Sequence, residues 1–285
     1  MIKNTLRTLS HFIPDKLYIK LRYYKRLHKL PNLKQPKTFN EKLQWLKLYN
    51  KNPLYTTLAD KYGVKEYIAD KIGEEYLIPT LGVWDKFDDI DFDTFPNEFV
   101  LKCTHDSGGL VICKDKSKLD IESARRKISK SLKTNYFWHA REWPYKNVKP
   151  RIIAEKFMKD RDFDNLNVFK IFNFNGEPKI IQTIQNDKMP NETIDYFDTD
   201  WNLLDLKQNY PNSQNPLPRP GTLTKMLDLA RILANDTAPF IRTDFYEIND
   251  KVYFSEFTFY SDSGFAKFTP EEWDLKLGDW INLQN

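Results

Sequence analysis

The sequence predicts an α+β protein whose two lobes surround a cleft. Predicted hairpins and helices alternate along its 285 residues without the strict strand–helix–strand rhythm of a parallel sheet. The hydrophobic fraction of 40% and the aromatic fraction of 15% favour a substantial core and argue against disorder. No apolar run approaches the ~20 residues that cross a bilayer. We therefore expect a folded protein without membrane-spanning helices.

The two cysteines and the N-terminus predict the compartment. The opening "MIKNTLRTLSHFIPDK" lacks the continuous apolar segment of a secretory signal. Cys103 and Cys113 form a single close pair, and such a pair is expected to stay reduced in a chain without an export signal. We expect a cytoplasmic protein with two free thiols.

The first 50 residues are predicted to form a basic helical arm. They hold 12 lysines and arginines against two acids, a net charge of +10, which leaves −6 on the rest of a chain whose total is +4. Within residues 15–30, one helical face carries apolar side chains, namely Leu17, Leu21, Tyr24 and Leu27. One interpretation is peripheral association with an anionic membrane, at its inner face, or with an anionic polymer, through residues 1–33. The other is a solvated helix packed on the body through this apolar face. Nucleic acid is not expected, because no nucleic-acid-binding motif accompanies the charge.

Four further helices are predicted. In the helix over residues 36–50, Thr38 and Glu41 have the spacing of a capping box. A second helix is expected over residues 56–73, with Gly73 as its stop signal. Two more are expected over residues 121–133, with Asp120 as N-cap, and over residues 223–236.

Three hairpins and one strand are predicted from alternating apolar runs around turn residues. The hairpins cover residues 98–115, 167–184 and 240–260, and the strand covers residues 151–158. The second hairpin contains Asn175-Gly176, a strong signal for a two-residue turn.

The last hairpin carries a charged constellation. A three-residue turn from Asn249 pairs apolar with apolar residues and places Asp244 opposite Glu256 and Arg242 opposite Thr258. Two carboxylates that face each other repel, so a cation is expected between them. The candidates are Arg242 and a Mg²⁺ with oxygen ligands. The structural alternative is a surface hairpin with solvated charges.

A second cluster follows the strand that carries Lys102. Its ammonium is expected beside the polar loop "HDSGG", and the amides of Ser107, Gly108 and Gly109 can approach an anion there, so phosphate is the natural ligand. His105 either donates to a phosphate or only shapes the turn. The spacing of the P-loop is absent.

The order of these motifs resembles the ATP-grasp fold, in which two α+β lobes hold ATP between them. The resemblance implies that Lys61, on a helix, and Lys102 bind phosphates, that the Ser-Gly-Gly loop closes over them, and that Arg242 is catalytic. It further implies an adenine hinge at Glu155, Lys156 and Met158, and metal binding by Asp244, Glu256 and Thr258, where Thr258 departs from the usual asparagine. The ribose acid is Asp160, Asp162 or Asp164, with Asp162 assigned to the site, and Lys170 either faces the nucleotide or is a solvated strand lysine.

Most of the chain is similar to the TupA-like ATP-grasp family, which is associated with bacterial surface polysaccharides. The motifs that carry this resemblance are "KTFNEKLQWLKLYN", "LADKYGVKEY", "LKCTHDSGG", "REWPYKNVKPRIIAEKF", "KIFNFNGEPK", "RTDFYEINDKVYFSEFTF" and "LGDW". It implies an arm over residues 1–50 with a reduced N-terminal domain, and an ATP-grasp domain over residues 51–285. Within that domain, a glycine-loop lobe spans about 96–158 and a metal-binding lobe about 159–285.

The activity that this resemblance implies is ATP-dependent ligation of a carboxylate to an amine through an acylphosphate, with ATP and Mg²⁺ as cofactors. The carboxylate is expected to be a uronic acid of a polysaccharide precursor, and the amine an amino acid or small amine. Two alternatives stay open. One is a glycosyltransferase that uses the "DTD" at residues 198–200, and the other is a sugar kinase.

Overall fold

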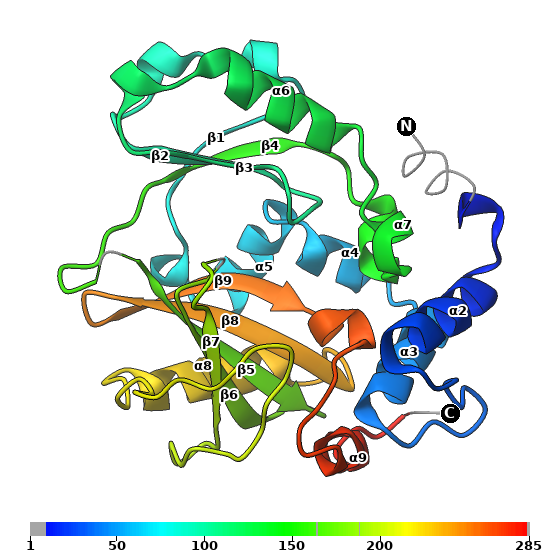
Figure 1. Ribbon diagram of the computed structural model, residues 1–285. Coiled ribbons are helices and arrows are strands. Elements are labelled where there is room, and N and C mark those ends of the chain that lie inside the picture. The colour runs from blue at the N-terminus through cyan, green and yellow to red at the C-terminus, as the bar shows by residue number, and fades with distance from the viewer. Residues whose placement is uncertain (1–9, 164, 188, 284–285) are drawn as a thin grey trace.

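The computed structural model describes residues 10–163, 165–187 and 189–283, and it contains two antiparallel sheets (Figure 1). The smaller sheet has the strand order β1-β4-β2-β3. Its strands are β1 (Thr80–Trp84), β2 (Phe99–Cys103), β3 (Leu110–Cys113) and β4 (Ile152–Lys156). Helix α6 (Ile121–Leu132) covers one face of this sheet, and together they enclose an apolar core that includes Phe99, Leu101 and Ile128.

The larger sheet has the strand order β7-β6-β5-β8-β9. Its strands are β5 (Asn167–Phe174), β6 (Glu177–Gln185), β7 (Thr193–Phe197), β8 (Phe240–Ile248) and β9 (Lys251–Thr258). Helix α8 (Leu223–Ala234) packs on one of its faces, as Figure 1 shows, through buried residues that include Met226, Leu229 and Leu233. The α+β class and the two-lobe arrangement that the sequence predicted are therefore present.

The remaining helices lie at one end of the sheets or between them (Figure 1). They are α2 (Asp15–Leu27), α3 (Phe39–Tyr49), α4 (Leu54–Ala59), α5 (Gly63–Ile72), α7 (Phe137–Ala140) and α9 (Glu272–Asp279). The predicted capping box of α3 is confirmed, because Thr38 accepts from the Glu41 amide and Glu41 accepts from the Thr38 amide. Short 3-10 turns connect several elements, among them η6 (Trp143–Asn147) and η7 (Ser261–Gly264).

The predicted helix over residues 56–73 is two helices, α4 and α5. The chain turns at Asp60, whose carboxylate accepts from the Tyr62 amide and pairs with Arg151 at 2.5 Å. Asx turns of this kind compete with the helical backbone. Lys61 therefore lies on a turn between two helices, and the prediction that it lies on a helix was wrong.

The two β-turns show why only part of the predicted register holds. Asn175 and Gly176 form the expected two-residue turn, with φ of 49° and 88°. The β8–β9 turn also has two residues, Asn249 and Asp250, rather than three. A bulge after Asp244 then restores the predicted pairs Asp244–Glu256 and Arg242–Thr258. Near the turn the predicted pairs are wrong, because Ile248 lies opposite Lys251.

Helix α2 packs on the body through a different face from the one predicted. Ile19 and Tyr23 are its buried residues, and Tyr23 contacts a small apolar cluster with Phe265 and Ala140. Leu17, Leu21 and Tyr24 are 49%, 54% and 57% exposed. The expected stripe is therefore mostly on the surface, and only its last member, Leu27, packs against the body.

Both cysteines are buried and free, as predicted. None of the helices in the described ranges is long and apolar enough to cross a membrane.

Candidate active site

A row of charged side chains crosses three neighbouring strands of the larger sheet. Lys170 of β5 lies opposite Asp244 of β8, and Asp244 lies opposite Glu256 of β9. Arg242 is two residues before Asp244 on the same strand, so its side chain lies on the same face. The predicted catalytic arginine and the predicted metal carboxylates are thus neighbours.

Arg242 holds Asp244 through two parallel hydrogen bonds. Its Nε donates to Oδ1 at 2.7 Å and its Nη2 donates to Oδ2 at 2.8 Å. Nη2 also donates to the Thr258 hydroxyl at 2.9 Å, and Lys170 Nζ lies 3.4 Å from Asp244 Oδ2. Burial opposes the charge on Arg242, but Asp244 outweighs it and raises the pKa of the guanidinium. Both residues are buried, which rules out a solvated surface hairpin.

The smaller sheet contributes a second ion-pair group. Lys102 of β2 and Lys65 of α5 each lie 2.7 Å from one carboxylate oxygen of Glu155 on β4. Burial raises the pKa of Glu155, but Lys102 and Lys65 outweigh it and hold the pKa below its ordinary value. For Lys102, burial lowers the pKa of the ammonium, but the nearby Glu155 carboxylate more than offsets this effect. The net pKa of Lys102 is therefore raised. Two lysines and one carboxylate leave an uncompensated positive charge here.

The two groups face each other. Glu155 is the main cause of the raised pKa of Lys102, and Tyr246 and Glu256, which belong to β8 and β9, raise it further. In Figure 1 the two sheets lie one above the other, with β2 and β4 in one and β8 and β9 in the other. The structure therefore brings Lys102, Arg242, Asp244 and Glu256 into one site formed by both lobes.

The glycine loop lies beside this site. Ser107 and Gly108 are exposed, whereas Gly109 is buried. A Cβ on Gly109 would come within 2.5 Å of Cys103 Sγ and 2.6 Å of Ser131 Oγ, so only glycine fits. Lys61 Nζ donates to the carbonyl oxygen of Asp106, which places this lysine at the base of the loop.

His105 faces away from the loop. It is 2% exposed, and its Nε2 lies 3.2 Å from the Ser131 carbonyl oxygen and 3.0 Å from that of Thr134. Of the two possibilities left open by the sequence, this contact favours the one in which His105 shapes the turn.

The residues predicted to bind adenine and ribose differ in their exposure and in their partners. Glu155 is buried in its lysine pairs, Lys156 is exposed, and Met158 is half-buried. Asp162 is exposed and pairs with Arg161 at 3.1 Å. Of the two alternatives to it, Asp160 accepts from the Asn249 amide at 2.7 Å, and Asp164 lies outside the described residues.

The "DTD" motif forms a turn after β7. Asp198 accepts from the amides of Asp200 and Asn202 at 3.0 and 2.8 Å and from the Asn202 side chain at 2.9 Å. Its carboxylate therefore organises the local chain, which weakens the glycosyltransferase alternative.

Two site residues were missed in the sequence. Lys65 follows Lys61 by four residues, and that spacing could have pointed to it. Asp262 of η7 follows the last hairpin. Desolvation by the surrounding protein raises the pKa of its carboxyl, while Arg242 and Lys170 lower it. No sequence pattern marks this residue.

The donor atoms of Asp244, Glu256 and Thr258 fit a magnesium ion. Mg²⁺ is usually bound by one or two carboxylates together with substrate phosphates and water. Across the described ranges, no group of three or more histidine, cysteine, aspartate or glutamate residues could hold a metal by itself. A site in which two carboxylates bind the ion and the nucleotide supplies the other ligands agrees with the usual ligands of Mg²⁺ and with the lack of a three-residue cluster in the described part of the chain.

A family model described as TupA-like ATPgrasp matches residues 41–282. This match confirms the predicted resemblance and the predicted fold class. None of the curated proteins matches the chain.

Three solved structures illustrate the likeness. The D-alanine–D-alanine ligase from Helicobacter pylori is 16% identical with a TM-score of 0.45, over 86% of this chain and 69% of that one. The corresponding ligase from Bacillus anthracis, complexed with ATP, is 17% identical with a TM-score of 0.46, over 79% and 65%. The D-cycloserine synthetase DcsG is 15% identical with a TM-score of 0.44, over 80% and 70%. This chain thus spans about two thirds of the length of these proteins.

Proposed function

We propose that this chain, which belongs to the TupA-like ATP-grasp family, is an ATP-dependent carboxylate–amine ligase that acts through an acylphosphate. The carboxylate would be a uronic acid of a surface polysaccharide precursor, and the amine an amino acid or small amine. The observation that carries the proposal is the Arg242–Asp244 ion pair beside Glu256, on the sheet that faces the Lys102–Glu155 ion pair of the other lobe.

The positive groups of both lobes suit an anionic substrate with several phosphates. Lys61, Lys65 and Lys102 would bind the phosphates of ATP from the side of the smaller sheet, and Lys170 from the larger one. The exposed amides of Ser107 and Gly108 would add donors, and closure of this loop would exclude water from the acylphosphate. Glu155 would hold Lys65 and Lys102 in place and limit their mutual repulsion.

The reaction would proceed in two steps, phosphoryl transfer and then amide formation. A carboxylate oxygen attacks the γ-phosphorus, the bond to the β-phosphate oxygen breaks, and ADP leaves. The amine nitrogen then attacks the acyl carbon, inorganic phosphate departs with the bond electrons, and the amine proton passes to water. Arg242 would stabilise the oxyanion that develops on the acyl carbonyl.

The metal ion would be held by Asp244, Glu256 and Thr258. When bound, Mg²⁺ would offset the charge on the transferring phosphoryl group. Asp244 already has Arg242 and Lys170 as partners, so these side chains would hold its carboxylate in place for the metal.

The experiment measures ADP release with both substrates present, and again with either the carboxylate or the amine left out. Glucuronic or galacturonic acid is supplied with a set of amino acids, and the product is identified by mass spectrometry. We expect ADP formation that needs both the carboxylate and the amine, with a product whose mass corresponds to an amide. A stable phosphosugar without amine would support the kinase, and use of a sugar nucleotide without ATP would support the glycosyltransferase.

We also propose that the protein is cytoplasmic and associates peripherally with the anionic inner face of the membrane through α2. The support is the exposed face of Leu17, Leu21 and Tyr24, flanked by basic residues. Amphipathic helices with this composition bury the apolar face at the lipid boundary and place the cations near the headgroups. The boundary of the arm at residue 50 stays a prediction.

A further inference from the structure

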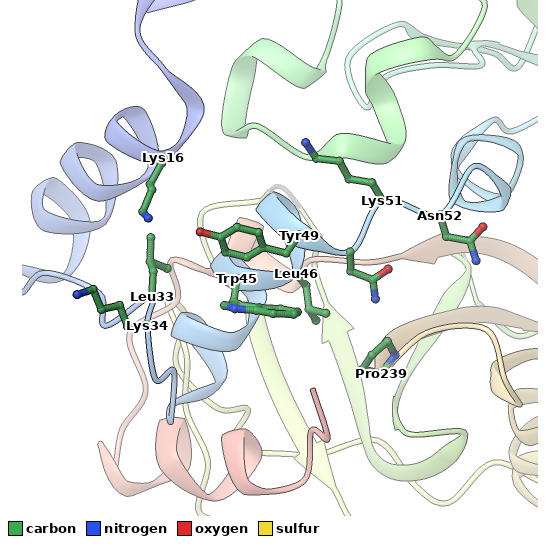
Figure 2. Close-up of a pocket in the computed structure, with 10 residues that line it drawn as sticks. Lys16, Leu33, Lys34, Trp45, Leu46, Tyr49, Lys51, Asn52 and Pro239 are labelled. Atoms are coloured by element: carbon green, nitrogen blue, oxygen red, sulfur yellow. The ribbon is translucent and has the colours of Figure 1, made fainter. Parts of the chain in front are cut away.

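A pocket of about 830 Å³ lies outside the candidate active site, between α2, α3 and the start of β8. Figure 2 shows the residues that line it. Lys16 comes from α2, Trp45 and Tyr49 from α3, and Lys34 and Lys51 from the loops that flank α3. Its volume is in the ~300–1,000 Å³ range of ligand-binding pockets.

The charge of this pocket has one sign. Ten residues line it, and three are lysines while none is acidic. Lys16, Lys34 and Lys51 are exposed, and none has an acidic partner within 4.0 Å in the parts of the chain that the structure describes. Lys65, Lys102 and Lys170 near the candidate active site each pair with a carboxylate. The three lysines of the pocket differ from them in having no such partner among the described residues. Unpaired lysines around one depression attract an anion.

The floor of the pocket is aromatic. The rings of Trp45 and Tyr49 lie with their centroids 5.1 Å apart, and Tyr49 is 49% exposed. In Figure 2 the two rings lie between Lys16 and Lys34 on one side and Lys51 on the other. Aromatic faces are electron-rich and pack against the C–H groups of a sugar ring. Asn50 and Asn52, also at the pocket, carry amides that suit hydroxyl groups.

We propose that this pocket binds an acidic oligosaccharide, with sugar rings on Trp45 and Tyr49 and carboxylates on Lys16, Lys34 and Lys51. The cations are three separate point charges. Unlike the lysines of the candidate active site, which lie beside the amides of the glycine loop, these lysines come from three different segments of the chain. Single carboxylates on successive sugars match dispersed lysines better. The choice of ligand rests on the proposed function, because an enzyme that modifies an acidic glycan gains affinity by holding the chain away from the reacting group.

The test is calorimetry on the full chain without ATP or amine. A short oligogalacturonate is the probe, and a neutral maltooligosaccharide of equal length is its control. We expect binding of the first only. Tyr49→Ala and Lys51→Glu should each raise the Kd about tenfold, or ~1.4 kcal/mol. Lys127→Glu is the matched control, because it makes the same charge change on an exposed part of α6 and should leave the Kd within about twofold.

Four outcomes would overturn the proposal. They are an equal loss in Lys127→Glu, binding of the neutral sugar, no binding of either sugar, and tighter binding of polyphosphate or a single-stranded oligonucleotide. Circular dichroism melts of each variant separate lost binding from lost folding.

The readout is independent of catalysis. Asp244→Asn should retain oligogalacturonate binding even where it loses turnover. If the oligosaccharide fails to bind while a monomeric uronic acid is still ligated, only this inference is wrong. If the oligosaccharide binds but no carboxylate is ligated, the proposed function is wrong, while the inference that this pocket binds an acidic oligosaccharide still holds.

Discussion

Arg242 and Asp244, two residues apart on β8, form a buried bidentate ion pair with bonds of 2.7 and 2.8 Å. The sequence left open whether an arginine or a metal ion would balance the carboxylates of this hairpin. In the structure, the guanidinium takes both oxygens of Asp244, whereas Glu256 lies on the neighbouring strand. The arginine therefore balances the charge of Asp244, and a metal would bind beside this ion pair.

Asp244→Asn should reduce both turnover and stability. An amide is a poorer ligand for Mg²⁺ than a carboxylate, so we expect at least about a hundredfold loss of ATP turnover, ~2.7 kcal/mol in the barrier. The change also leaves the Arg242 charge buried without its partner, which should cost about 3 kcal/mol of unfolding free energy. Coupled measurements of ADP release and urea unfolding check both effects.

The control for this variant is Asp228→Asn, which removes an exposed carboxylate 3.2 Å from Arg231 on α8. It should change neither quantity measurably, because surface pairs contribute little. If Asp244→Asn retained more than about a tenth of turnover, less than ~1.4 kcal/mol in the barrier, the metal assignment would be wrong.

Leu17→Ser combined with Leu21→Ser should weaken binding to vesicles that contain phosphatidylserine. Both leucines are about half exposed on the face of α2 that the body does not cover, so the fold should survive the change. We expect about a tenfold lower partition coefficient, ~1.4 kcal/mol. Deletion of residues 1–33 would be a poorer test, because it also removes the buried Ile19 and Tyr23.

Leu275→Ser is the matched control for α2. Leu275 is 46% exposed on α9 and lacks the basic surroundings of α2. Sedimentation of each variant with anionic and with neutral vesicles gives the partition coefficients. Equal partitioning of the α2 double variant and the wild-type protein would show that the exposed face does not contact lipid.

Local chemistry explains why much of the fold could be predicted. The capping box of Thr38 and Glu41 and the turn of Asn175 and Gly176 are encoded within a few residues, and both are present as predicted. The β8–β9 hairpin was harder, because its two-residue turn and its bulge after Asp244 compensate each other. A register prediction from apolar pairing alone cannot detect a bulge.

The sequence predicted which strands carry the site residues, but it did not predict which side chains form ion pairs with each other. Lys102 and Glu155 are 53 residues apart, and they meet because β2 pairs with β4. No local pattern encodes that pairing, so the sequence assigned the two residues to different ends of the nucleotide. The contact of Lys61 with the loop depends on the turn at Asp60, which the helical pattern concealed.

Gly109→Ala should destabilise the loop lobe, while Gly108→Ala should not. A methyl group at Gly109 meets Cys103 and Ser131 within 2.6 Å, whereas at Gly108 its nearest neighbour is Asp106 Oδ2 at 3.7 Å. Overpacking of this kind costs about 1–3 kcal/mol. Urea unfolding and calorimetric ATP binding of the two variants form a matched pair. Equal stability of the two would mean that the loop relaxes without cost.

Glu155 makes the stability of the fold depend on pH. Lys102 and Lys65 overcome the effect of burial and hold the pKa of Glu155 below its ordinary 4.5. Because the folded state lowers this pKa, the stabilisation is fully present above about pH 4.5 and is lost as pH falls through the folded-state pKa. Lys102 behaves in the opposite sense, since its raised pKa gives stability that is present below its ordinary 10.5 and is lost as pH rises through the folded-state value.

Glu155→Gln should remove both pH-dependent contributions to stability, that of the Glu155 carboxylate and that of Lys102. At neutral pH the variant leaves two lysines without their shared counter-charge in a mostly buried position, and we expect a loss of about 3 kcal/mol in unfolding free energy. The difference from the wild-type protein should be constant between about pH 6 and 9 and should shrink below about pH 4.5, as Glu155 takes up a proton. Urea unfolding from pH 3 to 10 measures this profile. Glu122→Gln, at an exposed residue of α6 that pairs with Arg125 at 3.2 Å, is the control and should give a flat, small difference. A difference for Glu155→Gln that stays constant down to pH 3 would mean that its carboxylate stabilises the lobe by packing and neutral hydrogen bonds rather than by its charge.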